Sequence, residues 1–562
     1  MNYEDKINIL PYIFVVFILS SYIVTISYKS KWLAILFVSC FFIALIFTIR
    51  PNVAIILILF FLVPIMNNFY YNNIKIGAKE EIRILSVNPY GGIGEISRRK
   101  VYLSGNIKNI KLGERFIANG KFSKEPNIEK GIIGEFEIYN LKKLTVDFKE
   151  RLYRLRENIY NSLSEKLGYR RSAIITSISF GYTEFLDLED KENMKSLGVL
   201  HAISVSGLHM VLVYTMLKKV FGEKITPIIS LIYVIFTGAA LSTVRAYIMM
   251  LCVSFATPLR RNYNPLASLS LAGIILMLIT PYSTSEVGFQ LSFLATLGII
   301  LFNKKINKAL YKLPKFFREG IAICISSQIF TFPVLALSFR EFSFGFLFGN
   351  LIIVPLMNAL VILGNLLALL VNFKAIFNYL AFIAYYITVF IDELTELLLK
   401  ITPNAMYVSE IISIGYIIML ITIYFYKKGY KRFIYFPSIL ILYFYFMVYT
   451  PLPKIEYFKE GIIAVSYKGE RTICAIKKNV NLEKYKIITL SQNVYKDFNS
   501  ISLGRDFKIL KINKNIILKG KNKNYLIDLG KEKSSYNYDI IDFKSNNYNK
   551  IILFKDKVLV FN

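Results

Sequence analysis

The sequence predicts a polytopic α-helical membrane protein with two soluble, β-rich parts. Hydrophobic residues make up 55% of its 562 positions and the mean hydropathy is +0.47. Apolar runs of roughly 17 residues or more recur, and each is long enough for a membrane helix. Two other stretches, 71–148 and 451–562, are polar and alternate with the period of two that is typical of strands. The predicted domains are therefore 1–70, 71–148, 149–450 and 451–562.

The chain is strongly basic. A formal net charge of +30 fits basic loops at an anionic membrane surface, and it also fits a polyanionic client such as nucleic acid. The four cysteines are scattered, which indicates neither a disulfide framework nor a zinc site. The sequence has no Walker-type phosphate loop. We therefore expect no cofactor, and we expect a partner motor or an ion gradient to supply any energy.

The first domain contains closely spaced apolar runs at 10–27, 32–49 and 51–66. They predict three membrane helices, the first of them an uncleaved anchor because no small-residue cleavage site follows it. The second domain is predicted to be a small β-domain. Its alternation is clearest at 101–107, 115–118 and 134–139. Its basic cluster, Arg98, Arg99 and Lys100, is the candidate DNA-binding surface, and a passive domain with a solvated basic face is the alternative.

The third domain begins with an amphipathic pattern over 148–168, which predicts a helix on the membrane surface or a brace under the bundle. Several of the spanning segments that follow are short or interrupted by Gly or Pro. The candidate segments are 208–221, 226–241, 243–259, 265–280, 287–302, 318–338, 346–371, 375–400, 408–426 and 432–449.

Both histidines of the chain, His201 and His209, lie in one short segment flanked by apolar runs. Polar groups at membrane depth are costly and are therefore functional candidates. We expect a helix that breaks at 204–207 and restarts with Ser206 as its N-cap, so that its positive end attracts an anion. The alternatives are helix-end histidines at the headgroup level and metal ligands. A separation of about 12 Å on a continuous helix disfavours one shared ion.

Arg245 lies inside another apolar run. A guanidinium there is costly unless it snorkels, pairs or faces water, and it can bind phosphate through two hydrogen bonds. Glu286, at the start of a later run, is a candidate partner, and snorkelling near a helix end is the alternative.

Residues 200–209 read LHAISVSGLH, which resembles the signature of the ComEC-type competence channels. Residues 181–186, 244–246 with Met249, and 288–296 are similar to further blocks of that family. The resemblance implies a channel, not an enzyme, that passes single-stranded DNA across the bacterial cytoplasmic membrane during natural transformation. It also implies an OB-like barrel for the second domain, a fold that often binds single strands.

The resemblance implies partners as well. These are single-stranded DNA and membrane lipid, a DNA receptor and pilus machinery outside, and an ATP-driven helicase or translocase inside. On this interpretation no residue is catalytic and none binds a metal. The candidate channel residues are His201, Ser204, Ser206, Gly207, His209, Arg245 and Gln290.

The basic tail at 451–562 is predicted to be a β-rich domain. Many ComEC-type proteins end in a metallo-β-lactamase-like domain, and Asp528 lies in a segment similar to one of its strands. That metal centre needs a cluster of histidines, whereas this sequence has none after His209. The resemblance therefore implies a degenerate remnant, and we expect no nuclease activity from it.

Two other functions stay open at this point. One is a membrane-embedded hydrolase with Ser204 or Ser206 as nucleophile and His201 or His209 as base, although no carboxylate lies nearby in sequence to orient the histidine. The other is a transporter of a different polyanionic or lipid-linked substrate.

Overall fold

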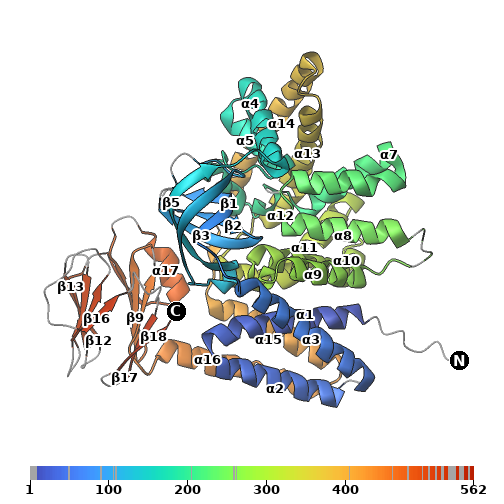
Figure 1. The fold of residues 1–562 in the computed structure, drawn as a ribbon. Helices are drawn as coiled ribbons and strands as arrows, with labels where there is room; N and C mark the ends of the chain where they lie inside the picture. The colour runs from blue at the N-terminus through green and yellow to red at the C-terminus, as the bar shows by residue number, and fades with distance from the viewer. Residues whose placement is uncertain are drawn as a thin grey trace. The chain divides into compact units, whose positions relative to one another are not determined.

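The computed structural model (Figure 1) describes residues 9–561 except 49–50, 89–90, 106, 108–109, 204, 257, 259, 261, 404, 459, 478–479, 497, 504–506, 513–514, 520–523, 529–538, 543–549 and 555–556. The chain divides into two compact units. The first unit is Met1–Thr331 with Ser343–Asn404, and the second unit is Phe332–Phe342 with Ala405–Asn562.

Three apolar helices open the first unit: α1 (Leu10–Lys29), α2 (Lys31–Thr48) and α3 (Pro51–Asn72). Phe17 of α1 and Leu57 of α3 are buried in one cluster with Leu269 of a later helix, α9 (Pro265–Ile279). Asn67 adds a polar tie, because its Nδ2 donates to the carbonyl of Leu278 at 2.9 Å. These helices are therefore an integral part of the helical core of the first unit.

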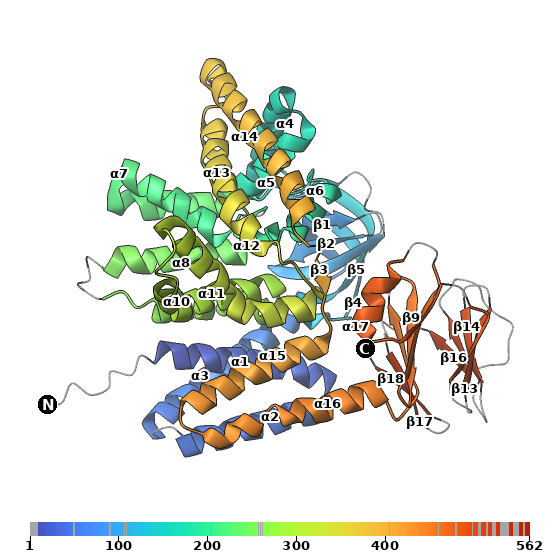
Figure 2. The same cartoon turned by 180° about the vertical axis from the view of Figure 1, so that it is seen from behind.

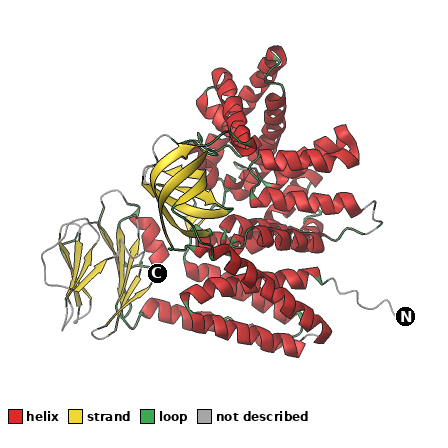
Figure 3. Ribbon diagram, in the orientation of Figure 1, coloured by secondary structure: helices red, strands yellow, loops and turns green. Residues whose placement is uncertain are grey.

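A closed five-stranded barrel follows, drawn in yellow in Figure 3. Its strands are β1 (Lys79–Asn88), β2 (Gly91–Ile96), β3 (Arg99–Gly105), β4 (Arg115–Ser123) and β5 (Ile132–Lys143). The order is β1-β2-β3-β5-β4, with β4 pairing back to β1 and β3 parallel to β5. Alternate side chains such as Val101 and Leu103 fill the interior. Gly94 allows close packing, since a β-carbon there would lie 2.7 Å from Ile82 Cγ2.

The rest of the first unit is helical. Its helices are α4 (Phe148–Leu167), α5 (Tyr169–Phe180), α6 (Leu188–Ser196), α7 (Gly207–Phe236), α8 (Leu241–Ala256), α9, α10 (Val287–Ala309), α11 (Lys315–Ser338, of which 332–338 belong to the second unit), α12 (Phe346–Phe348), α13 (Val354–Leu369) and α14 (Lys374–Ile401). Helix α4 is amphipathic, with Ile159 and Leu163 buried in one core with residues of α5, α13 and α14. Figure 2 shows α13 and α14 side by side, next to α4 and α5.

Nine helical segments within the described residues have the length and apolar composition of a membrane span, but one of them, Leu200–Phe236, contains α7 and is interrupted at Gly222. Three shorter apolar helices accompany them. Their number and composition are those expected of a multi-pass membrane protein. The large exposed apolar side chains along these helices are what a lipid-facing surface requires.

The second unit joins a helix pair to a β-sandwich. The pair is α15 (Glu410–Lys427) and α16 (Ser438–Tyr449), preceded by the short strands β6 (Glu341–Phe342) and β7 (Met406–Tyr407). One sheet has the order β11-β10-β9-β8-β17-β18 and the other β12-β13-β14-β15-β16. Their bounds are β8 (Lys454–Phe458), β9 (Ile462–Tyr467), β10 (Glu470–Ala475), β11 (Asn493–Tyr495), β12 (Ser500–Leu503), β13 (Phe507–Ile512), β14 (Asn515–Lys519), β15 (Asn524–Asp528), β16 (Asp539–Asp542), β17 (Lys550–Phe554) and β18 (Lys557–Phe561), with α17 (Leu482–Thr489) between β10 and β11.

Residues from both sheets of the sandwich share one apolar core, which includes Ile463 and Ile516. Among the described residues of the whole chain, no group of three or more His, Cys, Asp or Glu side chains is placed to hold a metal ion.

Candidate functional site

Helix α7 is a hairpin of two short helices. Gly222 has a non-helical backbone (φ 73°, ψ 178°) and separates them. Both ends of α7 lie beside Gly181, where a β-carbon would be 3.2 Å from the carbonyl oxygen of Thr237 and 3.6 Å from Val205 Cγ2. Each arm is roughly 22 Å long, shorter than the hydrocarbon core of about 30 Å. The chain therefore enters and leaves this hairpin at the same level.

The two spanning segments predicted at 208–221 and 226–241 are thus the arms of one hairpin. The sequence pattern also predicted a helix that breaks at 204–207 and restarts with Ser206 as its N-cap. The start at Gly207 after Ser206 is confirmed, but the prediction of one broken helix is wrong. A separate helix, α6, ends at Ser196, and only a 3₁₀ turn (Leu200–Ala202) stands between it and the start of α7. His201 lies exposed in that turn, and Ser204 lies outside the described residues.

The first turn of α7 holds the second histidine. Ser206 is the N-cap residue and Gly207 the first helical residue. His209 is fully buried, and its Nδ1 accepts a hydrogen bond from the backbone N–H of Ser206 at 3.3 Å. Its Nε2 has no hydrogen-bond partner among the described residues. The imidazole thus caps the helix, and one buried polar atom remains for a ligand or water.

Arg245 of α8 is also buried, with 8% of its surface exposed. Its Nη1 donates to the carbonyl of Ser292 and to the hydroxyl of Thr296, both on α10, while its Nε has no partner in the described part of the chain. The predicted partner, Glu286, is not used, because its carboxylate pairs with Lys100 at 3.1 Å. No salt bridge to Arg245 occurs among the described residues.

Gly207 brings the start of α7 against this guanidinium. A β-carbon at Gly207 would lie 2.5 Å from Arg245 Nη2 and 3.5 Å from the β-carbon of Ala246. The space beside Gly207 is therefore filled by the guanidinium of Arg245. The positive end of a helix and a guanidinium stand in direct contact. Without a carboxylate to neutralise them, the pair is suited to an anion, phosphate above all.

Gln290 has a different surrounding. Its Nε2 donates to the hydroxyl of Tyr22 at 2.9 Å and to the carbonyl of Thr284 at 2.8 Å. These bonds tie α1 to the start of α10, the helix that holds Arg245 in place. Gln290 thus lies on the same helix as Ser292 and Thr296 but away from the guanidinium contacts.

The predicted basic cluster of the barrel is split by the structure. Arg98 is exposed. Arg99 is buried and donates from Nε and Nη2 to the backbone carbonyls of Tyr71 and Tyr70, at 2.7 Å and 3.0 Å. Lys100 pairs with Glu286 and lies 4.5 Å above the ring of Tyr282. Two of the three cations therefore join the barrel to helices, and only Arg98 is presented to solvent.

Two tyrosines complete this joint. The hydroxyl of Tyr71, at the end of α3, donates to the carbonyl of Gly131 at 2.8 Å and accepts from the N–H of Lys100 at 3.0 Å. Gly131 has a positive φ of 68° and touches the ring of Tyr282, so a side chain there would clash. The barrel is thus fixed directly to the start of α10.

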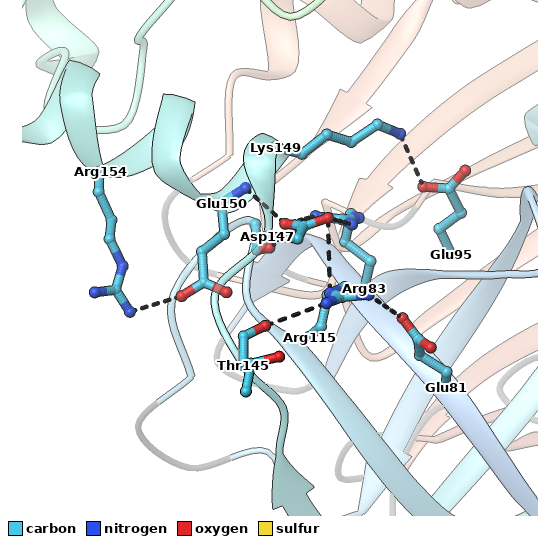
Figure 4. Close-up of polar contacts among 10 residues, drawn as sticks. Glu81, Arg83, Glu95, Arg115, Thr145, Asp147, Lys149, Glu150 and Arg154 are labelled. Atoms are coloured by element: carbon cyan, nitrogen blue, oxygen red, sulfur yellow. Dashed lines mark hydrogen bonds and ion pairs between the residues drawn. The ribbon is translucent and has the colours of Figure 1, made fainter.

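A second joint links the barrel to α4 (Figure 4). Asp147 caps α4 by accepting from the N–H of Glu150 at 2.9 Å, and it also receives a two-pronged contact from Arg83. Hydrogen bonding to Arg83 lowers the pKa of Asp147 to about 2. Arg115 lies 3.7 Å from the same carboxylate and 2.8 Å from Glu81. Every guanidinium of this joint therefore has a carboxylate.

Sequence reasoning missed several residues that shape the site. Ser292 and Thr296 are ordinary polar residues in an apolar run, and nothing in their spacing points to Arg245. Arg170 was also missed, although it contacts both Asp190 (2.6 Å) and Asp392 (3.0 Å) and so joins α5, α6 and α14. The signal for it was available in part, because a carboxylate in an apolar helix such as α14 needs a partner.

Comparison with known proteins adds to this geometry. A family model described as "Competence protein" matches residues 178–429. ComE operon protein 3 of Bacillus subtilis (strain 168) is 26% identical over 246 residues, which are 42% of this chain and 31% of that protein. Uncharacterized protein MG316 of Mycoplasma genitalium is 28% identical over 126 residues, 21% of this chain and 33% of its own length. No solved structure matches.

The match covers the part of the chain that carries the α7 hairpin, Arg245 and α10. The aligned region spans about a third of the length of each curated relative, 31% and 33%. The barrel and the β-sandwich lie outside the family match. The helical region therefore resembles the competence protein family over residues 178–429, and it is similar to ComE operon protein 3.

Proposed function

We propose that this protein passes single-stranded DNA across the bacterial cytoplasmic membrane during natural transformation. One observation carries the proposal: Arg245 is buried against the positive start of α7, and no described carboxylate neutralises it. Burying such a charge is costly, so its retention needs a reason. A phosphate of a passing strand supplies the missing negative charge. His209, with its unpartnered Nε2, stands in the same turn and adds a hydrogen bond.

The barrel supports the same function. Its closed five-stranded order is that of an OB-like barrel, and such barrels bind single strands through aromatic stacking and basic side chains. Tyr139, on β5, exposes 52% of its surface, and Arg98 and Lys121 are exposed cations. Because the barrel is fixed to the start of α10, a strand held on it stays close to the helix that positions Arg245.

The packed state of the site is a closed one. Arg245 and His209 are both buried, so a strand can pass only after helices around them separate. The α7 hairpin is the suitable moving part, since it enters and leaves at one level and carries a non-helical residue, Gly222, at its turn. An ATP-driven motor inside, a DNA receptor and pilus machinery outside belong to this proposal as partners.

We propose no enzymatic step. The geometry that would support a hydrolase is a serine hydroxyl bonded to an imidazole. His209 Nδ1 instead accepts from the backbone N–H of Ser206. For the C-terminal domain we propose a degenerate relative of the metallo-β-lactamase fold without nuclease activity, and its two packed sheets agree with such a fold. Asp528 ends β15 there, and the placement of its side chain lies outside the description.

The direct test is uptake of labelled DNA by a strain that lacks the protein and by the same strain complemented with it. The proposal expects DNA bound at the surface in both strains and DNA in the cytoplasm only in the complemented one. Normal cytoplasmic uptake in the deleted strain would refute it. Export or import of another polyanion or a lipid-linked substrate, lost in the deletion while DNA uptake persists, would favour the transporter alternative.

A further inference from the structure

A cavity of about 630 Å³ lies in the second unit, between the helix pair and the β-sandwich. Helix α15 contributes Glu410 and Ile411, and α16 contributes Tyr443 and Met447. The other walls are strands β8, β9 and β10, the end of α17 and Lys550 of β17. It belongs neither to the barrel joints nor to the Arg245 site.

The cavity lies at the level where a membrane surface is expected. Helix α15 begins at Glu410 and α16 ends at Tyr449, so the cavity is at the open end of a hairpin. Its two segments, Glu410–Lys427 and Lys431–Tyr449, are each long and apolar enough to span. Four residues separate α16 from β8, and no residue of α16 is buried. Exposed apolar side chains on α16, such as Leu442 and Phe446, would face lipid just below the cavity.

The charges in the cavity do not cancel. Arg340 pairs with Glu410, and Lys454 pairs with Glu456 at 2.5 Å. Arg471 forms no ion pair among the described residues, and Glu456, the carboxylate that acts on it through space, already pairs with Lys454. Arg471 is 6% exposed, its Nη1 donates to the carbonyl of Thr489 at 2.7 Å, and its Nε has no partner among the described residues. A buried guanidinium with an unused donor needs an acceptor.

Two features that line the cavity with Arg471, the Lys550 ammonium and the start of α15, also favour a bound anion there. Burial, and after it the nearby charge of Lys454, lowers the pKa of Lys550, while Glu456 and Glu410 act in the opposite direction, so Lys550 is a partly desolvated cation in the cavity wall. Ser409, the N-cap residue of α15, also lines the cavity and makes no side-chain capping bond, so the start of that helix faces the same space. Glu460 is the remaining carboxylate, and it hydrogen-bonds Tyr485.

We infer that this cavity binds the phosphate headgroup of an anionic phospholipid, with Arg471 as the central ligand and the acyl chains lying along α16. The chemistry recognised is a phosphate ester. A lipid is the source because the cavity opens where two exposed apolar helices end, which a soluble phosphate would not require. The inference is independent of DNA transport, since the site lies outside the α7–α8–α10 region.

The other large cleft does not compete for this role. It has a volume of about 610 Å³ and lies between the barrel and α4. Its cations are already paired there: Lys111 with Glu157, Lys143 with Glu114, and Arg154 with Glu150. That cleft has no unmatched positive charge, in contrast to the cavity around Arg471.

The test uses the full chain in nanodiscs of phosphatidylcholine that contain a minority of phosphatidylglycerol, with bound lipid counted by native mass spectrometry. The wild type should retain phosphatidylglycerol in preference to phosphatidylcholine. Arg471→Met keeps most of the side-chain volume but loses the donors, so retention should fall roughly tenfold or more. The matched control is Lys477→Gln, which removes one exposed charge of the same domain outside the cavity.

Equal retention by Arg471→Met and Lys477→Gln would overturn the inference, as would equal retention of the two lipids by the wild type. Complete displacement of the lipid by soluble glycerol phosphate would show that the ligand is a free phosphate ester and not a lipid. Arg471→Lys keeps the charge and should retain intermediate amounts of lipid. This variant keeps the test decisive if Arg471→Met lowers the unfolding temperature.

Discussion

The first unit holds partly or fully buried arginines at two places, and the two places differ in whether a carboxylate neutralises the guanidinium. At the barrel–α4 joint, Arg83 and Arg115 both reach Asp147, and Arg115 reaches Glu81 as well. Beside the α7 hairpin, Arg245 contacts only a carbonyl and a hydroxyl, and it lies against the positive start of a helix. The charges of Arg83 and Arg115 are thus neutralised within the protein. The charge of Arg245 has no counter-charge among the described residues.

This difference separates a structural from a functional use of the same side chain. A neutralised guanidinium fixes two elements together, and its removal costs stability. An unneutralised one at membrane depth lowers stability, so a function must retain it. The comparison predicts that variants of Arg245 chiefly affect transport, whereas variants around Asp147 chiefly affect folding.

The largest effect is expected from charge reversal at Arg245. Arg245→Glu places a carboxylate where a phosphate should pass, so cytoplasmic uptake of labelled DNA should be abolished. Arg245→Lys keeps the charge but loses the two-pronged geometry and should leave partial uptake. Lys305→Glu, an exposed reversal on α10, is the matched control and should transport nearly normally. Normal uptake by Arg245→Glu, at equal membrane abundance, would remove Arg245 from the DNA path.

The next effect concerns the contact between Gly207 and Arg245. Gly207→Ala introduces a β-carbon 2.5 Å from Nη2 and forces the guanidinium to move, which should reduce uptake on the order of tenfold. Gly207→Leu should reduce it further. Gly77→Ala, where a β-carbon would meet Glu80 Oε1 at 3.4 Å, is a control for the loss of a glycine. If Gly207→Leu takes up DNA as Gly77→Ala does, the close packing of α7 on Arg245 has no part in transport.

Much of the helical architecture follows from apolar runs, because a segment in lipid must satisfy its own backbone hydrogen bonds. The runs at 243–259 and 265–280 fall on α8 and α9, within a few residues. Helix pairing was harder to predict. The runs at 208–221 and 226–241 resemble two spans, and only the proximity of both α7 ends to Gly181 shows a hairpin.

The barrel shows how far strands could be predicted from the sequence. Three strands alternate visibly, but β2 reads GGIGEI and gives little apolar signal. At Gly94 the neighbouring side chains already fill the interior, because a β-carbon there would clash with both Ile82 and Leu103. Side-chain partners were the least predictable part. Glu286 is equally plausible in sequence for Arg245 and Lys100, and only the fold decides for Lys100.

A smaller, structural effect is expected at Asp147. Its folded-state pKa is about 2, lowered from 3.8 chiefly by the hydrogen bond from Arg83. Because its pKa is lower in the folded state, ionised Asp147 stabilises the fold at pH values above its unfolded-state pKa. This contribution is lost as the pH falls from about 4 toward 2. Asp147→Asn should therefore cost about 2 kcal/mol at neutral pH, and the difference from the wild type should shrink on acidification.

The measurement for Asp147 is thermal unfolding of the full chain in detergent at a series of pH values. Glu81→Gln is the matched control, because its carboxylate is 55% exposed and pairs with Arg115 at the surface. It should cost less than about 1 kcal/mol. A destabilisation of Asp147→Asn that does not change with pH would mean that the ion pair with Arg83 is not its cause, because asparagine keeps the oxygen that caps α4.

The smallest effect on uptake is expected from His209→Gln. This variant distinguishes a histidine that binds phosphate in a channel from a histidine that acts as a general base in a hydrolase. The imidazole accepts from the N–H of Ser206 through Nδ1 and leaves Nε2 without a partner. A glutamine amide offers an acceptor and a donor in similar volume, so both roles can continue and uptake should fall by less than about tenfold. His209→Leu offers neither and should be worse, because the buried N–H of Ser206 then loses its partner.

A general base cannot be replaced by an amide, and loss of one from a nucleophile pair lowers the rate by several orders of magnitude. If His209→Gln is inactive while Arg245→Lys takes up DNA normally, the channel hypothesis is refuted and the hydrolase hypothesis is favoured. Partial activity of both would place the two side chains together as ligands of a passing phosphate.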